Sequence, residues 1–215
     1  MSDCIKNGTD LPSGNRLHGK IRTVDRREPY RNYFSVVEHD LQVPRFDGGQ
    51  SDVITRAAFV SGDAVSVLPY DPGRDRVLVI EQFRFGPQVR GDVAPWKLEA
   101  IAGRIDAGET PEQTAHRELH EETGTSVSEL LLVGQYYPAP GAVSEYMYSY
   151  VGLADLPDGT GGISGLEAED EDIKSHVIGF EQAMDMLANG AIDTGPLIIS
   201  LLWLAKHRDG LRNGA

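Results

Sequence analysis

Three glutamates, Glu118, Glu121 and Glu122, have the side-chain type and the spacing to bind a metal ion. On a helix, positions i, i+3 and i+4 lie on one face, so the three carboxylates would be stacked together. Arg117 lies four residues before Glu121 and can pair with it, but one arginine does not neutralise three carboxylates. Mg²⁺ and Mn²⁺ prefer carboxylate oxygen and would offset the repulsion. A solvated acidic helix face is the alternative interpretation of the same pattern.

The residues around these glutamates carry the signals of a helix that begins and ends abruptly. Thr110 is a suitable N-cap, Pro111 fits the first helical position, and Gln113 completes a capping box with Thr110. Gly124 is suited to a left-handed helix end. The sequence therefore predicts a helix over 111–123.

Strands are predicted on both sides of this helix, because apolar and alternating runs are separated by turn residues. The predicted strands lie in 21–43 (a hairpin), 53–68 (two strands), 77–85, 96–103, 128–138, 145–156 and 173–180. Turns are expected at 47–49 and 71–75, a loop at 85–95 and a glycine-rich, then acidic, loop at 156–172. Two more helices are predicted, in 180–190 and 196–208.

This order of elements indicates an α+β protein or an α/β/α sandwich around a mixed sheet. Residues 1–20 resemble a loose tail, and the Gly48-Gly49 break suggests a boundary. We therefore expect a small β-rich annex over 1–50 and a main domain over 51–215.

Composition excludes several classes of function. The chain has 215 residues, 20 Lys and Arg against 33 Asp and Glu, and a net charge of −13, which disfavours binding to nucleic acid. The single cysteine, Cys4, cannot form an internal disulfide and suits a reducing compartment. The polar start lacks a signal-peptide core, and the apolar run 196–205 is too short to span a bilayer. We expect a cytoplasmic protein with no membrane partner.

The string around the three glutamates resembles the Nudix box, which is G, five residues, E, seven residues, REUxEExGU, where U is aliphatic. Gly103, Glu109 and the run from Arg117 to Gly124 match every fixed polar and glycine position. Thr125, in place of an aliphatic residue, is the one departure, and it bears on helix docking rather than on metal binding. The resemblance implies the Nudix fold and hydrolysis of a nucleoside diphosphate linked to another moiety.

The flanks resemble ADP-ribose pyrophosphatases of the bacterial dimeric kind. The entry into the box, PWKLEAIAGRIDAGE, has the form of these enzymes, and Pro140 lies sixteen residues after Gly124. GLEAEDEDIKSHV resembles a loop that supplies a catalytic glutamate, and REPYRNYFSV resembles N-terminal strands that exchange between subunits. The resemblance implies Mg²⁺-dependent hydrolysis of ADP-ribose to AMP and ribose 5-phosphate, with Mn²⁺ as an alternative metal, by a homodimer.

The resemblance also implies the metal ligands and the catalytic carboxylates. Glu118, Glu122 and the main-chain carbonyl of Ala102 correspond to the central ligands, and Glu121 is a further ligand that also counts among the catalytic carboxylates. Glu169 corresponds to the loop glutamate that orients or deprotonates the attacking water, with Glu171 as its substitute. From charge alone, the same loop reads as a solvated acidic segment.

Five positions correspond to substrate-binding residues. Arg56 and Arg84 match arginines that hold the diphosphate, Tyr33 matches an aromatic that stacks on adenine, Glu145 lies near the terminal ribose, and Gly103 opens the box. The alternatives are a surface arginine for Arg56, a strand tyrosine for Tyr33 and an exposed strand glutamate for Glu145.

Two rival functions follow from the same residues. The first is hydrolysis of another nucleoside diphosphate compound, such as GDP-mannose, NADH or FAD, because specificity resides in the loops and the N-terminal residues. The second is a ligand sensor without turnover, which the full set of box carboxylates disfavours. A panel of nucleoside diphosphate sugars assayed with Mg²⁺ distinguishes them.

Overall fold

The computed structural model describes residues 20–165 and 171–214, which form two compact units. The N-terminal unit ends at Ser61 and includes Gly141–Val143, and the larger unit contains Gly62–Pro140 and the chain from Ser144 onward. The sequence suggested a boundary at the Gly48-Gly49 break, whereas the compact units divide after Ser61. Residues 1–20, which the sequence predicts to be a tail, lie outside the described residues except for Lys20.

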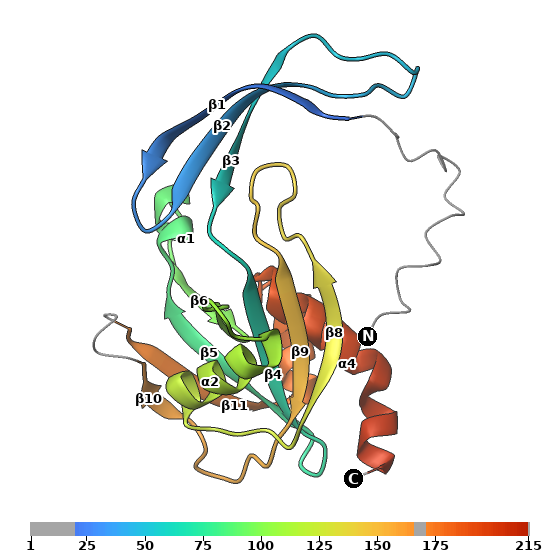
Figure 1. The fold of residues 1–215 in the computed structure, drawn as a ribbon. Helices are drawn as coiled ribbons and strands as arrows, with labels where there is room; N and C mark the ends of the chain where they lie inside the picture. The colour runs from blue at the N-terminus through green and yellow to red at the C-terminus, as the bar shows by residue number, and fades with distance from the viewer. Residues whose placement is uncertain (1–19, 166–170, 215) are drawn as a thin grey trace. The chain divides into compact units, whose positions relative to one another are not determined.

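The N-terminal unit is a three-stranded antiparallel sheet in the order β1-β2-β3 (Figure 1). Its strands are β1 (Arg22–Arg31), β2 (Ser35–Gln42) and β3 (Ile54–Val60). The hairpin predicted over 21–43 is therefore confirmed. The predicted turn is also present, because Gly48 adopts a φ of 88° and Asp47 accepts a hydrogen bond of 2.9 Å from the N–H of Gly49.

The larger unit contains a mixed eight-stranded sheet in the order β10-β11-β5-β4-β9-β8, with β6 on β5 and β7 on β4. The β4–β9 pair is parallel, and the other pairs are antiparallel. The strands are β4 (Ala64–Asp71), β5 (Arg76–Phe83), β6 (Trp96–Glu99), β7 (Ile101–Arg104), β8 (Glu129–Tyr136), β9 (Met147–Leu153), β10 (Gly162–Ser164) and β11 (Ile173–Gly179). The helices are α1 (Phe85–Arg90), α2 (Pro111–Thr123), α3 (Phe180–Ala188) and α4 (Gly195–Asn213).

Two hydrophobic clusters cover the two faces of this sheet. Side chains alternate along a strand, so Leu78 and Ile80 of β5 pack with Leu119 of α2, whereas Val77 and Val79 pack with residues of α3 and α4. Figure 1 shows α2 and α4 on opposite faces of the sheet. The larger unit is therefore an α/β/α sandwich, and the predicted α+β class is confirmed.

Three segments differ from the sequence prediction. Residues 96–103, expected as one strand, divide at Ala100 into β6, which pairs with β5, and β7, which pairs with β4. The predicted loop 156–172 contains β10, which pairs with β11, and the predicted loop 85–95 contains the short helix α1. The strand pairs depend on residues distant in the sequence, and α1 has neither a side-chain cap nor a buried residue.

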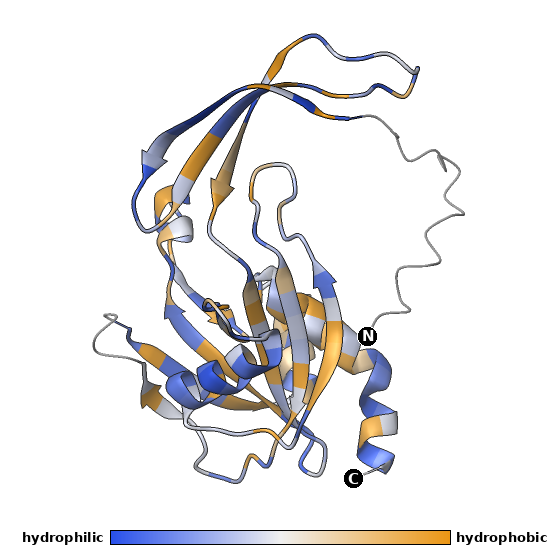
Figure 2. Ribbon diagram, in the orientation of Figure 1, coloured by the Kyte–Doolittle hydropathy of each residue, from blue (hydrophilic) through white to orange (hydrophobic). Residues whose placement is uncertain are grey.

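The final helix, α4, begins at the predicted apolar run and is buried at Leu197, Leu201 and Leu204. In Figure 2 its first half is mostly apolar, and its end is hydrophilic. No helix among the described residues is long and apolar enough to cross a membrane.

Candidate active site

Local sequence signals determine where α2 begins and ends. Thr110 accepts a hydrogen bond of 3.3 Å from the N–H of Gln113, and the Gln113 side chain accepts one of 2.8 Å from the N–H of Thr110. Gly124 ends the helix with a φ of 63°. Ala115 and Leu119 are fully buried beneath α2, while most of its surface is hydrophilic in Figure 2. The predicted helix over 111–123 is confirmed.

Arg117 binds the carboxylates of α2. Its Nη1 lies 2.7 Å from Glu118 Oε1 and 3.0 Å from Glu121 Oε2, so the predicted Arg117–Glu121 pair is confirmed. Glu109 also binds this guanidinium, at 3.0 and 3.1 Å. The hydrogen bond from Arg117, aided by one from Thr114, lowers the pKa of Glu109 to about 2. Glu109 therefore holds Arg117 in place, a role that its box position alone did not reveal.

Glu122 is a buried acid that lacks a full set of partners. It is 3% exposed, and its Oε2 has no hydrogen-bond partner among the described residues. Burial raises the pKa of Glu122 to about 9, and the charges of Glu118 and Glu171 act in the same direction. Arg84 and a hydrogen bond from the main chain of Ala102 only partly oppose this rise in the pKa. A buried, under-coordinated carboxylate of this kind suits a cation.

Gly103 makes room for Glu118. A Cβ placed on Gly103 would overlap the carboxyl group and the Cγ of Glu118, so any larger residue would displace that carboxylate. The Glu118 side chain is 13% exposed, and burial raises its pKa even though Arg117 opposes the shift. The structure thus gives Gly103 a steric role beside the acidic face of α2.

Arg84 directly follows β5 and binds Glu99, the last residue of β6. Its Nη2 lies 2.6 Å from Glu99 Oε2, and its Nε lies 3.1 Å from both carboxylate oxygens. Burial lowers the pKa of Arg84, but Glu99, Glu122 and Glu171 together raise it above its ordinary value. The guanidinium of Arg84 therefore interacts with the carboxylates of Glu99, Glu122 and Glu171. Sequence reasoning missed Glu99, because the residues alone do not show that β6 pairs with β5.

The acidic loop is described at its two ends. Glu169 lies outside the described residues. The charge of Glu171 acts on Glu118, Glu122 and Arg84. On the other side of the loop, the hydroxyl of Ser164 donates a hydrogen bond to the main-chain carbonyl of Glu122. The loop is thereby anchored to the last turn of α2.

The other predicted site residues lie elsewhere in the chain. Tyr33 and Arg56 belong to the N-terminal unit, where both side chains are exposed. Glu145 precedes β9 in the larger unit, and its charge adds to the effect of burial in raising the pKa of Tyr136. The larger unit therefore contains Arg84, Ala102, Gly103, Glu118, Glu121, Glu122 and Glu171, whose contacts and charges link them, and also Glu145.

A preformed metal site is absent from residues 20–165 and 171–214. No three His, Cys, Asp or Glu side chains in these residues are placed to hold an ion. Arg117 draws Glu118 and Glu121 toward itself. The chemistry of the donors nevertheless fits a hard divalent cation, because Glu122 Oε2 is buried without a partner and further carboxylate oxygens lie nearby.

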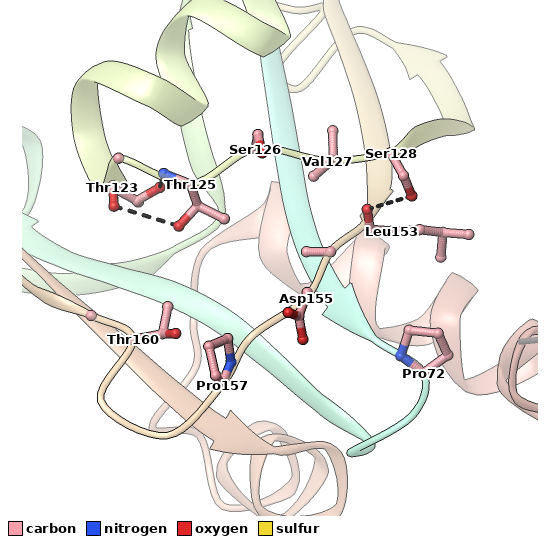
Figure 3. Close-up of a pocket in the computed structure, with 13 residues that line it drawn as sticks. Pro72, Thr123, Thr125, Ser126, Val127, Ser128, Leu153, Asp155, Pro157 and Thr160 are labelled. Atoms are coloured by element: carbon pink, nitrogen blue, oxygen red, sulfur yellow. Dashed lines mark hydrogen bonds between the residues drawn. The ribbon is translucent and has the colours of Figure 1, made fainter.

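A surface pocket lies at the opposite end of α2 from its N-cap (Figure 3). Hydroxyl groups of Thr123, Thr125, Ser126 and Ser128 line it, and Ser128 donates a hydrogen bond of 3.1 Å to the Leu153 carbonyl. Asp155 is the one charged side chain among the described residues that line this pocket. It therefore lacks the cations that a diphosphate needs, and the acidic face of α2 with Arg84 is the better candidate site.

Comparison with known proteins identifies the family. The NUDIX domain model matches residues 60–199. ADP-ribose pyrophosphatase of Haemophilus influenzae is 38% identical over 186 residues, which cover 86% of this chain and 85% of that protein. The enzyme of the same name from Escherichia coli strain K12 is 37% identical over 193 residues, with coverage of 90% and 91%.

A more distant relative and a solved structure agree with this result. GDP-mannose pyrophosphatase of an Enterobacter species is 33% identical over 187 residues, covering 86% of this chain and 95% of that protein. A crystal structure of an ADP compounds hydrolase has a TM-score of 0.68 at 22% identity, covers 89% of this chain and 96% of that chain, and shows the shared fold. Together these matches establish that the chain belongs to the NUDIX family.

Proposed function

We propose that the chain hydrolyses the diphosphate of ADP-ribose to AMP and ribose 5-phosphate in a Mg²⁺-dependent reaction. The chain is a Nudix pyrophosphohydrolase, and its relatives from Haemophilus influenzae and Escherichia coli carry the name ADP-ribose pyrophosphatase. The observation that carries the proposal is the buried Glu122 carboxylate with its unpartnered Oε2, surrounded by the charges of Glu118 and Glu171.

In this proposal, Glu118, Glu121, Glu122 and the carbonyl of Ala102 hold the metal. A bound divalent cation would neutralise the diphosphate and lower the pKa of an attacking water. The N–H of Ala102 faces Glu122, and the N–H and C=O of one residue in an antiparallel strand point toward the same edge. The Ala102 carbonyl therefore faces the side on which Glu122 lies. Arg117 contacts one oxygen of Glu118 and one of Glu121, so the second oxygen of each carboxylate would be the metal ligand.

The remaining residues divide between water and substrate. Glu169, with Glu171 as its substitute, would orient or deprotonate the water. Arg84 would bind the diphosphate, because guanidinium groups form paired hydrogen bonds with phosphate oxygens. Arg56 would bind the same group, Tyr33 would stack on adenine, and Glu145 would lie near the terminal ribose.

We also propose that the chain is a homodimer that exchanges its N-terminal strands. Of the described residues in the N-terminal unit, no apolar side chain is buried in the single chain. Val24, Tyr30, Tyr33 and Phe46 are all more than half exposed, at 51%, 53%, 71% and 84%. A sheet that exposes so much apolar surface is stabilised by a partner. Sedimentation of the full chain tests this proposal, and a monomer at micromolar concentration would contradict it.

The activity is tested by incubating the purified chain and Mg²⁺ with ADP-ribose and, separately, with GDP-mannose. We expect AMP and ribose 5-phosphate from ADP-ribose, no product in EDTA, and a much lower rate with Glu122→Gln. GDP-mannose is the second candidate because of the relative at 33% identity. A higher kcat/KM for GDP-mannose would replace ADP-ribose as the substrate, and turnover unchanged by EDTA would overturn the metal assignment.

A further inference from the structure

The contact between Arg84 and Glu99 uses only one edge of the guanidinium. Glu99 accepts hydrogen bonds from Nε and Nη2, the side-on edge of the group. A guanidinium has five N–H donors in a rigid fork, so the edge that carries Nη1 points away from Glu99. That outer edge can bind a second anion while the inner edge stays occupied.

The backbone around Arg84 explains why its side chain reaches Glu99. Arg84 has an extended backbone, with φ −126° and ψ 125°, and its N–H donates a hydrogen bond of 2.9 Å to the carbonyl of Pro95. Glu99 lies opposite Ile80 in the β5–β6 pair, which is four residues before Arg84. The Arg84 side chain therefore extends back along β5 past Gln82, which is 7% exposed.

Two other carboxylates compete with Glu99 for Arg84. The charges of Glu122 and Glu171 act on Arg84, so these two carboxylates are the competing partners for its guanidinium. The Glu99 side chain is 16% exposed and is held in the sheet, whereas the Arg84 side chain is 41% exposed. A fixed acid that binds a more exposed base determines the direction in which that base points.

We propose that Glu99 is the positioning residue for Arg84, holding the inner edge of its guanidinium so that the outer edge binds the substrate diphosphate. This inference rests on the proposed function, in which Arg84 contacts the diphosphate. Without Glu99, Arg84 would turn toward Glu122 and Glu171, where it would weaken substrate binding and compete with the metal for carboxylate oxygen.

The experiment compares Glu99→Gln, Arg84→Ala and the double variant in full-length protein. Glu99→Gln keeps the size of the side chain and removes its charge. We expect its kcat/KM to fall about tenfold, mainly through KM, and the Mg²⁺ concentration for half-maximal rate to rise. Arg84→Ala is expected to lower kcat/KM about 100-fold. Adding Glu99→Gln to Arg84→Ala should then change little, because Glu99 acts through Arg84.

Glu81→Gln is the matched control. Glu81 lies on β5 beside Gln82 but pairs with His176 at 2.9 Å, and side-chain alternation places it on the other face of the sheet from Gln82. This variant loses the same charge from a neighbouring position without touching Arg84. We expect wild-type kinetics and a wild-type Mg²⁺ requirement.

A binding measurement separates this inference from the proposed function. Calorimetry with Mg²⁺ and the non-hydrolysable α,β-methylene analogue of ADP-ribose, and with Mg²⁺ and inorganic pyrophosphate, measures diphosphate binding without turnover. The inference is supported if Glu99→Gln binds these ligands more weakly than Glu81→Gln does, and if Glu99→Gln has no effect on binding in the Arg84→Ala background. This result would stand even if the wild type does not hydrolyse ADP-ribose. Equal binding by the two charge variants, or additive effects in the double variant, would overturn it while leaving wild-type ADP-ribose hydrolysis intact.

Discussion

Gly103 and Glu118 lie so close that a single methyl group on Gly103 would occupy the space of the Glu118 carboxyl. The box thus pairs a glycine on β7 with a glutamate on α2 for steric reasons. The carboxylate can lie against the strand backbone only where no side chain stands in its way.

Gly103→Ala is therefore expected to displace Glu118 and lower kcat/KM by about 100-fold, since small displacements of a catalytic group have effects of this size. The steady-state rate with ADP-ribose and Mg²⁺ measures it. Gly134→Ala is the control and should retain full activity, because a Cβ added to this strand glycine meets no atom within 4 Å. Equal activity of the two variants would show that Glu118 does not need its position against β7.

Glu122→Gln should separate activity from stability. We expect kcat to fall by about 100- to 1000-fold, because a metal ligand is lost. The folded pKa of Glu122 is raised from 4.5 to about 9, so its ionisation disfavours the folded state. In the metal-free wild type, the contribution of this carboxyl to stability is therefore greatest below pH 4.5 and falls as the pH rises toward 9. The neutral glutamine removes this loss.

Thermal unfolding in EDTA tests whether the ionised Glu122 carboxylate destabilises the folded state. At pH 8 the Tm of Glu122→Gln should exceed that of the wild type by at least about 3 °C, and the difference should shrink toward pH 5. Added Mg²⁺ should raise the Tm of the wild type and not that of the variant. A variant that is less stable than the metal-free wild type at pH 8 would contradict the burial argument.

Asp75 joins the β4–β5 turn to the C-terminal helix, and its loss should affect stability alone. Its carboxylate binds Arg208, accepts a hydrogen bond of 2.8 Å from the Tyr70 hydroxyl and lies 2.5 Å from Arg212. Asp75→Asn tolerates the positive φ of this position, removes the charge and should lower the Tm by about 3–8 °C. Activity per folded molecule should not change.

The control for Asp75 is Asp158→Asn, which breaks an ion pair between Arg76 and a side chain that is 97% exposed. A pair with so exposed an acid contributes little to stability, so the Tm should move by no more than about 2–3 °C. The Arg208 hydrogen bond is the main cause that lowers the pKa of Asp75, so the stabilisation is present above its ordinary pKa and is lost in acid. The difference in Tm between wild type and Asp75→Asn should therefore narrow below pH 4.

Tyr33→Ala tests the proposed adenine contact. The Tyr33 side chain is 71% exposed, so its removal should leave the fold and the Mg²⁺ requirement unchanged. We expect KM for ADP-ribose to rise about tenfold with a similar kcat, because stacking on a base contributes about 1–3 kcal/mol. Tyr30→Ala, which removes an exposed tyrosine of β1 in the same unit, is the control. Equal KM values for both variants would remove Tyr33 from the substrate site.

Sequence reasoning worked best where the signals are local. The capping box at Thr110 and the glycine at 124 determine α2 within a few residues of chain, so its bounds were predictable. The acidic face and the Arg117–Glu121 pair follow from helical spacing. The division at Ala100 was not predictable, because it arises where one segment changes partner from β5 to β4.

The partner of Arg84 was unpredictable for a related reason. Glu99 is fifteen residues away in the sequence and reaches Arg84 only because β6 pairs with β5 and the arginine extends back along its strand. The orphaned oxygen of Glu122 likewise depends on how deeply α2 is buried. The roles of Tyr33, Arg56 and Glu145 stay predictions, which the variants above can test.

Gly165 and Glu171 are adjacent at the base of the acidic loop, because a Cβ on Gly165 would lie 2.6 Å from the Glu171 carbonyl oxygen. Ser164 and Ile173 are a cross-strand pair of β10 and β11. The residues on either side of the intervening five are therefore held by the sheet. Insertions and deletions between them would be absorbed locally. The number of residues between the two ends can therefore change in the course of evolution without altering the pairing of β10 with β11.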